Sequence, residues 1–403
     1  MRTIALYLTI LLIFFIGWED LVYIEAIDSS ITRIAGPLVI AFWGGMVLIT
    51  GKIRRIQLFH VLFGLFILWH MLSLVWTIDD DKSTDRLVTF IQLFAFSWLV
   101  WDLLVKPGSI FAALQFYVIG LYISASNIII NFIIGQESAY QRFSAGTFDT
   151  NDLAVMLVLG MPIAWYLVIY RESPYFPQPM RVINLMYIPL GLLAVTLTAA
   201  RTAVIALVPV ILFISLGLPR LNIWFKLLIG LGIVVVIVNV PRLAPEASLE
   251  RISTTVDEIQ SGTLNGRTII WAEAIRVIGQ QPFLGVGTGA FETAAIETGK
   301  PPHNVFLSVF AELGVIGFTL FMVIFGLVLF AALSHPYQES ILMCTLLGVW
   351  LIGALSLNWE WKKITWILFT LIVTSMYAHF KAKQTSDSGI EAQAVGETAF
   401  KAA

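Results

Sequence analysis

The stretch Asn304–Ala331 reads NVFLSVFAELGVIGFTLFMVIFGLVLFA, and Glu312 is its one charged residue. About 20 apolar residues are enough for a helix to cross a hydrocarbon core roughly 30 Å thick. Similar apolar runs recur from one end of the chain to the other, and none shows the two-residue alternation of barrel strands. The chain is therefore expected to be an all-α, polytopic membrane protein.

The composition agrees with lipid as the solvent. The 403 residues are 58% hydrophobic and 12% charged, whereas soluble domains carry about 25% charged residues. A net charge of −2 gives no electrostatic reason to bind nucleic acid. The single cysteine, Cys344, lies inside an apolar run and excludes a disulfide framework.

The apolar runs predict about twelve membrane spans. The first is taken as an uncleaved span, because no small-residue cleavage site precedes its acidic end, WED. Residues 1–240 are expected to hold nine spans, 241–303 one large loop, 304–380 three spans, and 381–403 a disordered tail. The spans are expected at roughly 3–17, 31–51, 56–76, 86–105, 109–134, 150–170, 183–199, 202–218, 222–240, 304–331, 338–357 and 361–380.

Basic residues in short loops predict the orientation, because cytoplasmic loops of membrane proteins carry an excess of Lys and Arg. With the N-terminus inside, the opposite short loops are acidic, and both termini are expected in the cytoplasm. The large loop is then expected on the outer face. The basic residues on the cytoplasmic side would be Arg2, Lys52, Arg54, Arg55, Lys106, Arg171, Arg181, Arg220, Lys226, Lys381 and Lys383.

The large loop contains a helical pattern over Thr268–Gln280. Helical spacing places one apolar set and one polar set on different faces. A short amphipathic helix at the outer membrane–water interface is therefore expected. The apolar face would hold Ile270, Trp271, Ala274, Ile275 and Ile278, and the polar face Glu273, Arg276 and Gln280.

Three residues in or near this loop are suited to chemistry. His303 follows Pro301 and Pro302, which restrict the backbone before it, and a neutral histidine can accept a proton. Arg267 stands at the start of the amphipathic helix, where an anion is favoured. Arg201 lies at a tight turn between two spans, and guanidinium groups match phosphate oxygens. Snorkelling to lipid headgroups is the alternative for Arg201.

Other patterns point less clearly to function. Arg142 is a third outward arginine, with a salt bridge to Glu137 or Asp149 as its alternative. The sequence TIDDDKSTD contains clustered carboxylates, but a solvated loop with a helix cap at Ser83 or Thr84 is favoured over a metal site. GVGTG at 285–289 lacks the preceding strand of a nucleotide loop, so it is expected to shape a turn.

Taken in order, these residues resemble the signature region of the O-antigen ligase and polymerase superfamily. Its pattern is matched by Arg267, Trp271, Pro282, Gly285, Gly287, His303, Asn304, Glu312, Gly314 and Gly317. RFSAGTFDTNDLA from Arg142 and AARTA around Arg201 resemble two further family stretches. The similarity covers about 140–317.

The resemblance implies a GT-C-like, metal-independent glycosyltransferase without a cofactor, in the bacterial inner membrane with its site facing the periplasm. The donor would be a glycan on undecaprenyl diphosphate. The acceptor would be lipid A–core in a ligase, or a lipid-linked glycan in an O-antigen or exopolysaccharide polymerase. Arg201 and Arg267 would stabilise the diphosphate, and His303 would be the general base. Substrate binding would fall to Arg142, Asn304, Arg276 and Trp271.

Two other classes remain as alternatives. A transporter of lipid-linked sugars predicts charges at mid-membrane and repeat symmetry, whereas the residues singled out above collect at one outer surface. A peptidoglycan polymerase predicts an essential carboxylate in the outer loop, for which Asp257 or Glu258 are available.

Overall fold

The computed structural model describes residues 1–24, 29–138, 142–169, 178–224 and 266–381, and scattered positions from 226 to 234. In these ranges the regular secondary structure is helical apart from one short hairpin, in which β1 (Tyr23–Ile24) pairs antiparallel with β2 (Ser29–Ser30). The helices are α1 (Arg2–Ile16), η1 (Glu19–Leu21), α2 (Ile31–Thr50), α3 (Leu58–Ser73), α4 (Asp80–Leu103), α5 (Pro107–Ile133), α6 (Thr150–Ile169), α7 (Gln178–Thr198), α8 (Arg201–Gly217), η3 (Leu218–Arg220), α12 (Arg267–Gln280), α13 (Phe291–Ala294), α14 (Val305–Leu333), α15 (Tyr337–Ala354) and the last helix, Lys363–Lys381.

Eleven of the expected spans coincide with helices of this structure. Within the described ranges, nine helices are long and apolar enough to cross a membrane, and α1 and α3 are shorter apolar helices. Most of the expected span 222–240, the loop residues 241–265 with Asp257 and Glu258, and most of the tail 381–403 lie outside the described residues. The prediction of a helical protein is confirmed, and these helices are consistent with a polytopic membrane protein.

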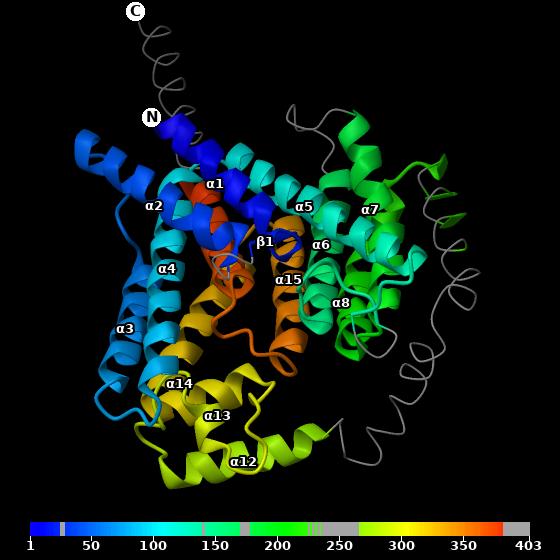
Figure 1. The fold of residues 1–403 in the computed structure, drawn as a ribbon. Coiled ribbons are helices and arrows are strands. Elements are labelled where there is room, and N and C mark those ends of the chain that lie inside the picture. The colour runs from blue at the N-terminus through cyan, green and yellow to red at the C-terminus, as the bar shows by residue number, and fades with distance from the viewer. Residues whose placement is uncertain are drawn as a thin grey trace, which may run out of the picture.

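Helix α6 lies at the centre of one half of the bundle, among α5, α7, α8 and α15 (Figure 1). It is buried from Leu153 to Val168, as expected for a helix that is apolar on all sides. Peripheral helices instead expose large apolar side chains, such as Leu48 on α2 and Ile211 on α8. Exposed apolar surface on the periphery is typical of a protein solvated by lipid.

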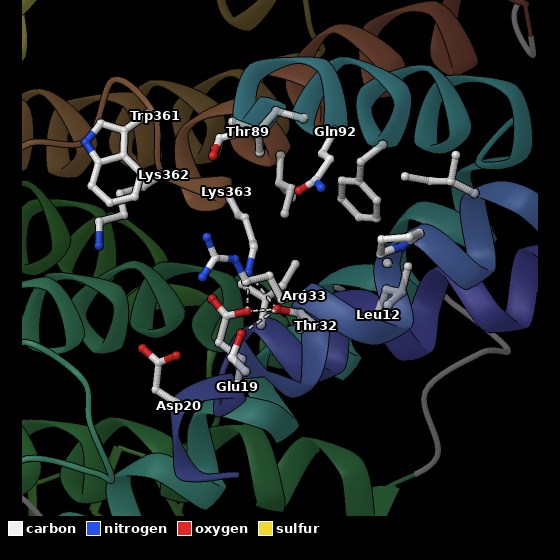
Figure 2. A pocket seen from close by; sticks show the side chains of 18 residues that line it. Leu12, Glu19, Asp20, Thr32, Arg33, Thr89, Gln92, Trp361, Lys362 and Lys363 are labelled. Carbon is white, nitrogen blue, oxygen red and sulfur yellow. Dashed lines mark hydrogen bonds and ion pairs between the residues drawn. The ribbon is translucent and has the colours of Figure 1, made fainter. Parts of the chain in front are cut away.

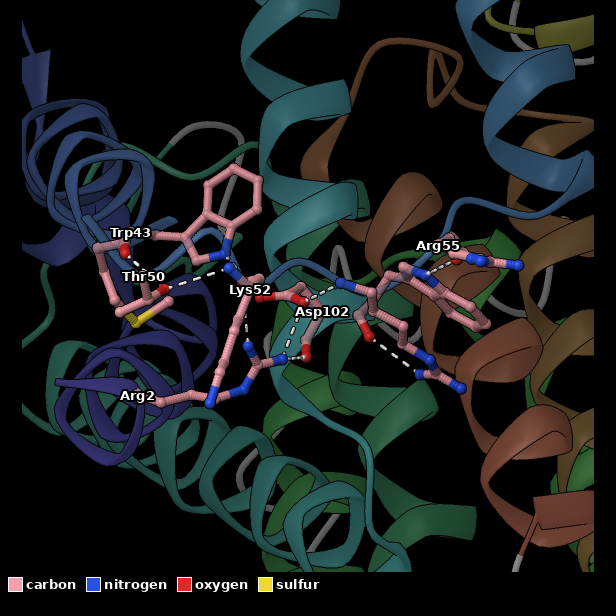
Figure 3. A network of polar contacts seen from close by, with 9 residues as sticks. Arg2, Trp43, Thr50, Lys52, Arg55 and Asp102 are labelled. Carbon is pink, nitrogen blue, oxygen red and sulfur yellow. Dashed lines mark hydrogen bonds and ion pairs between the residues drawn. The ribbon is translucent and has the colours of Figure 1, made fainter. Parts of the chain in front are cut away.

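A buried carboxylate connects three helices at the end of the bundle that carries the N-terminus (Figure 3). Asp102, at the end of α4, accepts hydrogen bonds from the Arg2 guanidinium at 2.8 Å, the Trp43 indole at 3.0 Å and the Arg54 backbone N–H at 2.7 Å. Arg54 also covers the Trp101 ring, 3.5 Å from its centroid. Because buried charges need such partners, this network fixes α1, α2 and α4 relative to one another.

At the opposite end, α14 is interrupted at Gly314, where φ is 63° and ψ is −169°. The loop 281–290 packs into the interruption. The backbone N–H groups of Val286 and Gly287 donate to the carbonyls of Ala311 and Glu312 at 3.0 and 2.9 Å, and Val315 N–H donates to Pro282 O at 2.9 Å. GVGTG therefore forms a turn, as expected, and the glycines of the two motifs make the close approach between loop and helix possible.

Helix α12 lies across this end of the molecule (Figure 1). The amphipathic helix is present, but the prediction of its faces was partly wrong. The buried side chains are Ile270, Glu273, Ala274 and Val277, whereas Ile275 is 63% exposed. The reason is tertiary: α12 packs on α14 and α13, and the Glu273 carboxylate accepts hydrogen bonds from the backbone N–H groups of residues 297 and 298.

Candidate functional site

His303 occupies an unusual backbone position directly before α14. Its φ is 48°, a left-handed conformation that costs energy in a non-glycine residue. Two contacts with Asn358 compensate: the His303 N–H donates to Asn358 Oδ1 at 2.8 Å, and Asn358 Nδ2 lies 3.3 Å from His303 Nδ1. The loop after α15 thus fixes both the backbone and the ring of His303.

Helix α12 is joined to the same segment. The Trp271 indole donates to the carbonyl of Pro302 at 3.0 Å, one residue before His303. Arg267 lies four residues before Trp271, and residues four apart share one face of a helix. The prolines, Trp271 and Asn358 therefore hold His303 between α12 and α15, on the side of α12 that carries Arg267.

Arg201, Arg267, His303 and Asp149 form one electrostatic cluster, which we call the basic site. Burial lowers the pKa of Arg267 below its usual value, Asp149 opposes this shift and Arg201 adds to it. Burial also lowers the pKa of His303 below 6.5; Arg267 lowers it further, while Asp149 raises it. His303 is consequently neutral at pH 7, and the positive charges of Arg201 and Arg267 would stabilise an anion bound near them.

Two contacts bring the start of α8, and so Arg201, into the basic site. Thr202 Oγ lies 2.7 Å from Ser356 Oγ, two residues before Asn358. Arg142 donates from Nε to Thr198 O and from a terminal nitrogen to Asn151 Oδ1, both at 2.8 Å. Arg142 thereby connects the turn before Arg201 to the start of α6. This geometry gives Arg142 a positioning role.

Two other residues expected to bind substrate have structural contacts. Asn304 is the N-cap of α14, and its side-chain oxygen accepts from the N–H groups of Phe306 and Leu307. Arg276 lies nine residues after Arg267, hence on the opposite face of α12. Its guanidinium donates to Ala294 O at 2.9 Å, so the structure does not bring Arg276 into the basic site.

The sequence did not predict two residues of this site. Asp149 was considered only as a salt-bridge partner of Arg142, and Asn358 was not considered. Asp149 stood in the quoted stretch TFDTND, and here its carboxylate accepts from the N–H groups of Asn151 and Asp152 at the start of α6. Asn358 follows α15 in a stretch without a recognisable motif. Its relation to His303 depends on contacts between residues 55 positions apart.

The acidic loop before α4 has a structural explanation. Helix α4 begins at Asp80, and Asp79 caps it by accepting from the Lys82 N–H at 3.1 Å. The expected cap at Ser83 or Thr84 was therefore wrong. In the described part of the chain, no three His, Cys, Asp or Glu side chains are grouped so that they could hold a metal ion.

Many apolar helices of membrane-spanning length, with two arginines and a histidine close together near one end, are typical of a multi-pass membrane protein. A family model described as O-antigen ligase matches residues 186–322, which include Arg201, Arg267, Trp271 and His303. This match supports the O-antigen ligase superfamily for the chain. No curated protein matches it.

Proposed function

We propose that the protein transfers a glycan from undecaprenyl diphosphate to an acceptor hydroxyl, and we favour lipid A–core as the acceptor. The family supports ligase- or polymerase-type glycosyl transfer in general. The proposal is carried by the contacts that bring the starts of α8 and α12 close to His303, namely Thr202 with Ser356, Trp271 with Pro302 and Asn358 with His303. A polymerase that joins lipid-linked repeat units would use the same site with another acceptor.

In this reaction the bond between the sugar C1 and the diphosphate oxygen breaks, and the acceptor oxygen forms a new bond to C1. The electron pair of the broken bond remains on the diphosphate, where negative charge develops. Arg201 and Arg267 stabilise that charge, and fixed charges aimed at a developing charge commonly make the largest contribution to catalysis. Direct displacement inverts the anomeric centre and involves no metal ion.

The contact with Asn358 bears on the role of His303. Because Asn358 Oδ1 accepts the His303 N–H, its Nδ2 group faces His303 Nδ1 and donates to it. In the neutral ring the proton then lies on Nε2. We propose that this N–H donates a hydrogen bond to the departing diphosphate, and that the exposed Asp149 carboxylate takes the proton of the acceptor hydroxyl.

The alternative role for His303 is the general base expected from the sequence. It requires a lone pair on Nε2, hence a turn of the Asn358 amide that would remove the bond to the His303 backbone. Glutamine can donate a hydrogen bond but is a very weak base. His303→Gln should therefore retain most of the activity if His303 is a donor, and should be as inactive as His303→Ala if it is the base.

The test uses purified protein in detergent with a lipid-linked oligosaccharide donor, and either lipid A–core or further donor as the acceptor. We expect one added glycan on lipid A–core and a loss of about 10²–10³-fold in kcat for Arg267→Ala. Arg276→Ala, on the opposite face of α12, is the matched control and should transfer normally. A ladder from donor alone would show a polymerase, and equal losses in both arginine variants would refute the assigned site.

We also propose the orientation and location. The N-terminal end, with Arg2, Lys52 and Arg54, would face the cytoplasm. The end with α12 would then face the periplasm of a bacterial inner membrane, with twelve spans in a GT-C-like arrangement. Reporter fusions at residue 260 and at the C-terminus test this, and a cytoplasmic signal at residue 260 would contradict it.

A further inference from the structure

A cavity of about 350 Å³ lies between α1, α2, α4 and the start of the last helix (Figure 2). One part of its wall is apolar and is formed by Leu12, Ile40, Leu93, Phe96 and Ile367. Another part is charged and includes Glu19, Asp20, Arg33, Lys362 and Lys363. A wall divided in this way is suited to a ligand with a hydrocarbon part and a polar part.

The charged part of the wall is held in place by an ion pair. Lys363 Nζ lies 2.6 Å from Glu19 Oε2 and 2.6 Å from Thr32 Oγ, and Thr32 also donates to Glu19. Lys362 is paired with Asp152 at 3.2 Å. Arg33 is exposed at the rim and makes no hydrogen bond or ion pair within the residues described. Its guanidinium is thus available to a phosphate group.

The cavity continues toward the basic site. A second, smaller cavity of about 60 Å³ shares Ile16, Glu19, Asp20, Lys362 and Lys363 with the first. Its wall also contains Asp149 and Asp152. Since the charge of Asp149 acts on both Arg267 and His303, a polar group extending from the large cavity through the small one approaches the reacting groups.

The cavity is distinct from the place where the donor diphosphate is proposed to bind. Arg201 and Arg267 belong to α8 and α12, and neither helix contributes to the wall of either cavity. Asp149 lies between the two regions and is the residue proposed to take the acceptor proton. The two cavities together extend from a partly apolar space to Asp149, where the acceptor hydroxyl is proposed to react.

We propose that this cavity, with Arg33 among its lining residues, is the binding site of the glycolipid acceptor. Its hydrocarbon contacts Leu12, Ile40 and Phe96, its phosphate binds Arg33, and its sugar hydroxyls extend past Asp20 and Lys362 to Asp149. The inference rests on the proposed glycosyl transfer and specifies its second substrate. It excludes a free oligosaccharide or a soluble protein as the preferred acceptor, because neither would fill the apolar part.

Two pairs of variants test this. Gln92 lines the cavity from α4 and its neighbour Ile91 does not, although both are exposed. Gln92→Trp should obstruct the cavity, and Ile91→Trp is its control. Arg33→Ala removes the cation at the rim, and Lys52→Ala removes an exposed cation at the other end of α2.

The readout is the direct binding of radiolabelled lipids to purified protein in detergent, which does not depend on transfer. The probes are lipid A–core, an undecaprenyl-diphosphate-linked repeat unit, undecaprenyl diphosphate alone and core oligosaccharide without lipid. We expect Gln92→Trp and Arg33→Ala to weaken binding of one acceptor glycolipid at least tenfold, with both controls unchanged. Undecaprenyl diphosphate should be weakened only if its glycan-linked form is. Which of the two glycolipids is affected identifies the acceptor.

Other outcomes would overturn the inference. These are unchanged binding of both glycolipids in the two cavity variants, no binding of either to wild-type protein, weakened binding of undecaprenyl diphosphate with unchanged binding of its glycan-linked form, or equal binding of the lipid-free oligosaccharide. Glycan transfer, measured with the same variants, distinguishes a failure of the proposed acceptor cavity from a failure of the proposed function. Wild-type transfer with unaltered glycolipid binding in the variants would refute the acceptor cavity alone, whereas cavity-dependent binding without transfer would refute the proposed function alone.

Discussion

Replacing Gly314 by alanine should undock the loop that positions α12. The backbone at Gly314, with φ 63° and ψ −169°, lies in a region that is essentially restricted to glycine. A Cβ atom built there would lie 2.1 Å from Phe283 O and 2.3 Å from Phe283 C. Both atoms are backbone, so no flexible side chain can move to relieve the clash.

The expected cost has two sources. Backbone strain of this kind costs about 1–3 kcal/mol. Moving residues 282–287 away also weakens the three backbone hydrogen bonds to Ala311, Glu312 and Val315, at about 0.5–1.5 kcal/mol each. Because such contributions are not additive, we expect a total destabilisation of about 3–5 kcal/mol.

Gly326→Ala is the matched control, because Gly326 lies in the same helix and a Cβ atom there would meet nothing within 4 Å. Alanine in a regular helix should be neutral or stabilising by about 0.5–1 kcal/mol. Hydrogen exchange of residues 267–290, thermal unfolding and glycan transfer are compared for both variants. Faster exchange in α12 and reduced transfer are expected for Gly314→Ala alone, and equal behaviour of the two variants would refute the reasoning.

Three further predictions concern polar contacts. Asn358→Ala removes both contacts to His303 and should lower kcat about 10–100-fold at unchanged donor KM; steady-state kinetics with wild-type kcat would contradict this. Burial raises the pKa of Glu360 from 4.5 to about 7. Between these two pH values Glu360 is ionised in the unfolded chain but protonated in the folded chain. The free energy of unfolding should therefore fall by about 3 kcal/mol as the pH rises through this range. Unfolding measured at pH 5 and pH 8 should show that Glu360→Gln lacks this fall, and an equal fall in the variant would be evidence against it. Asp102→Ala leaves the Trp43 indole and the Arg54 N–H without their acceptor and should destabilise the fold by about 2–3 kcal/mol; an unfolding midpoint equal to that of wild type would exclude this role.

The sequence determined the elements of this protein, because their signals are local. Apolar runs predicted eleven helices that the structure contains, since a segment in lipid must satisfy its own backbone hydrogen bonds. The spacing over Thr268–Gln280 likewise predicted α12. The order of Arg267, His303 and the glycine motifs indicated the family that the comparison supports.

The tertiary structure alone decided which groups meet. The buried face of α12 depends on α13 and α14, so Glu273 is buried and Ile275 is exposed. Asn358 reaches His303 across 55 positions, and the cavity joins α1, α2, α4 and the last helix. These relations arise from packing between distant segments, which hydrophobic periodicity does not encode. The sequence therefore predicted the candidate site residues, whereas the fold determined their contacts and the cavity beside them.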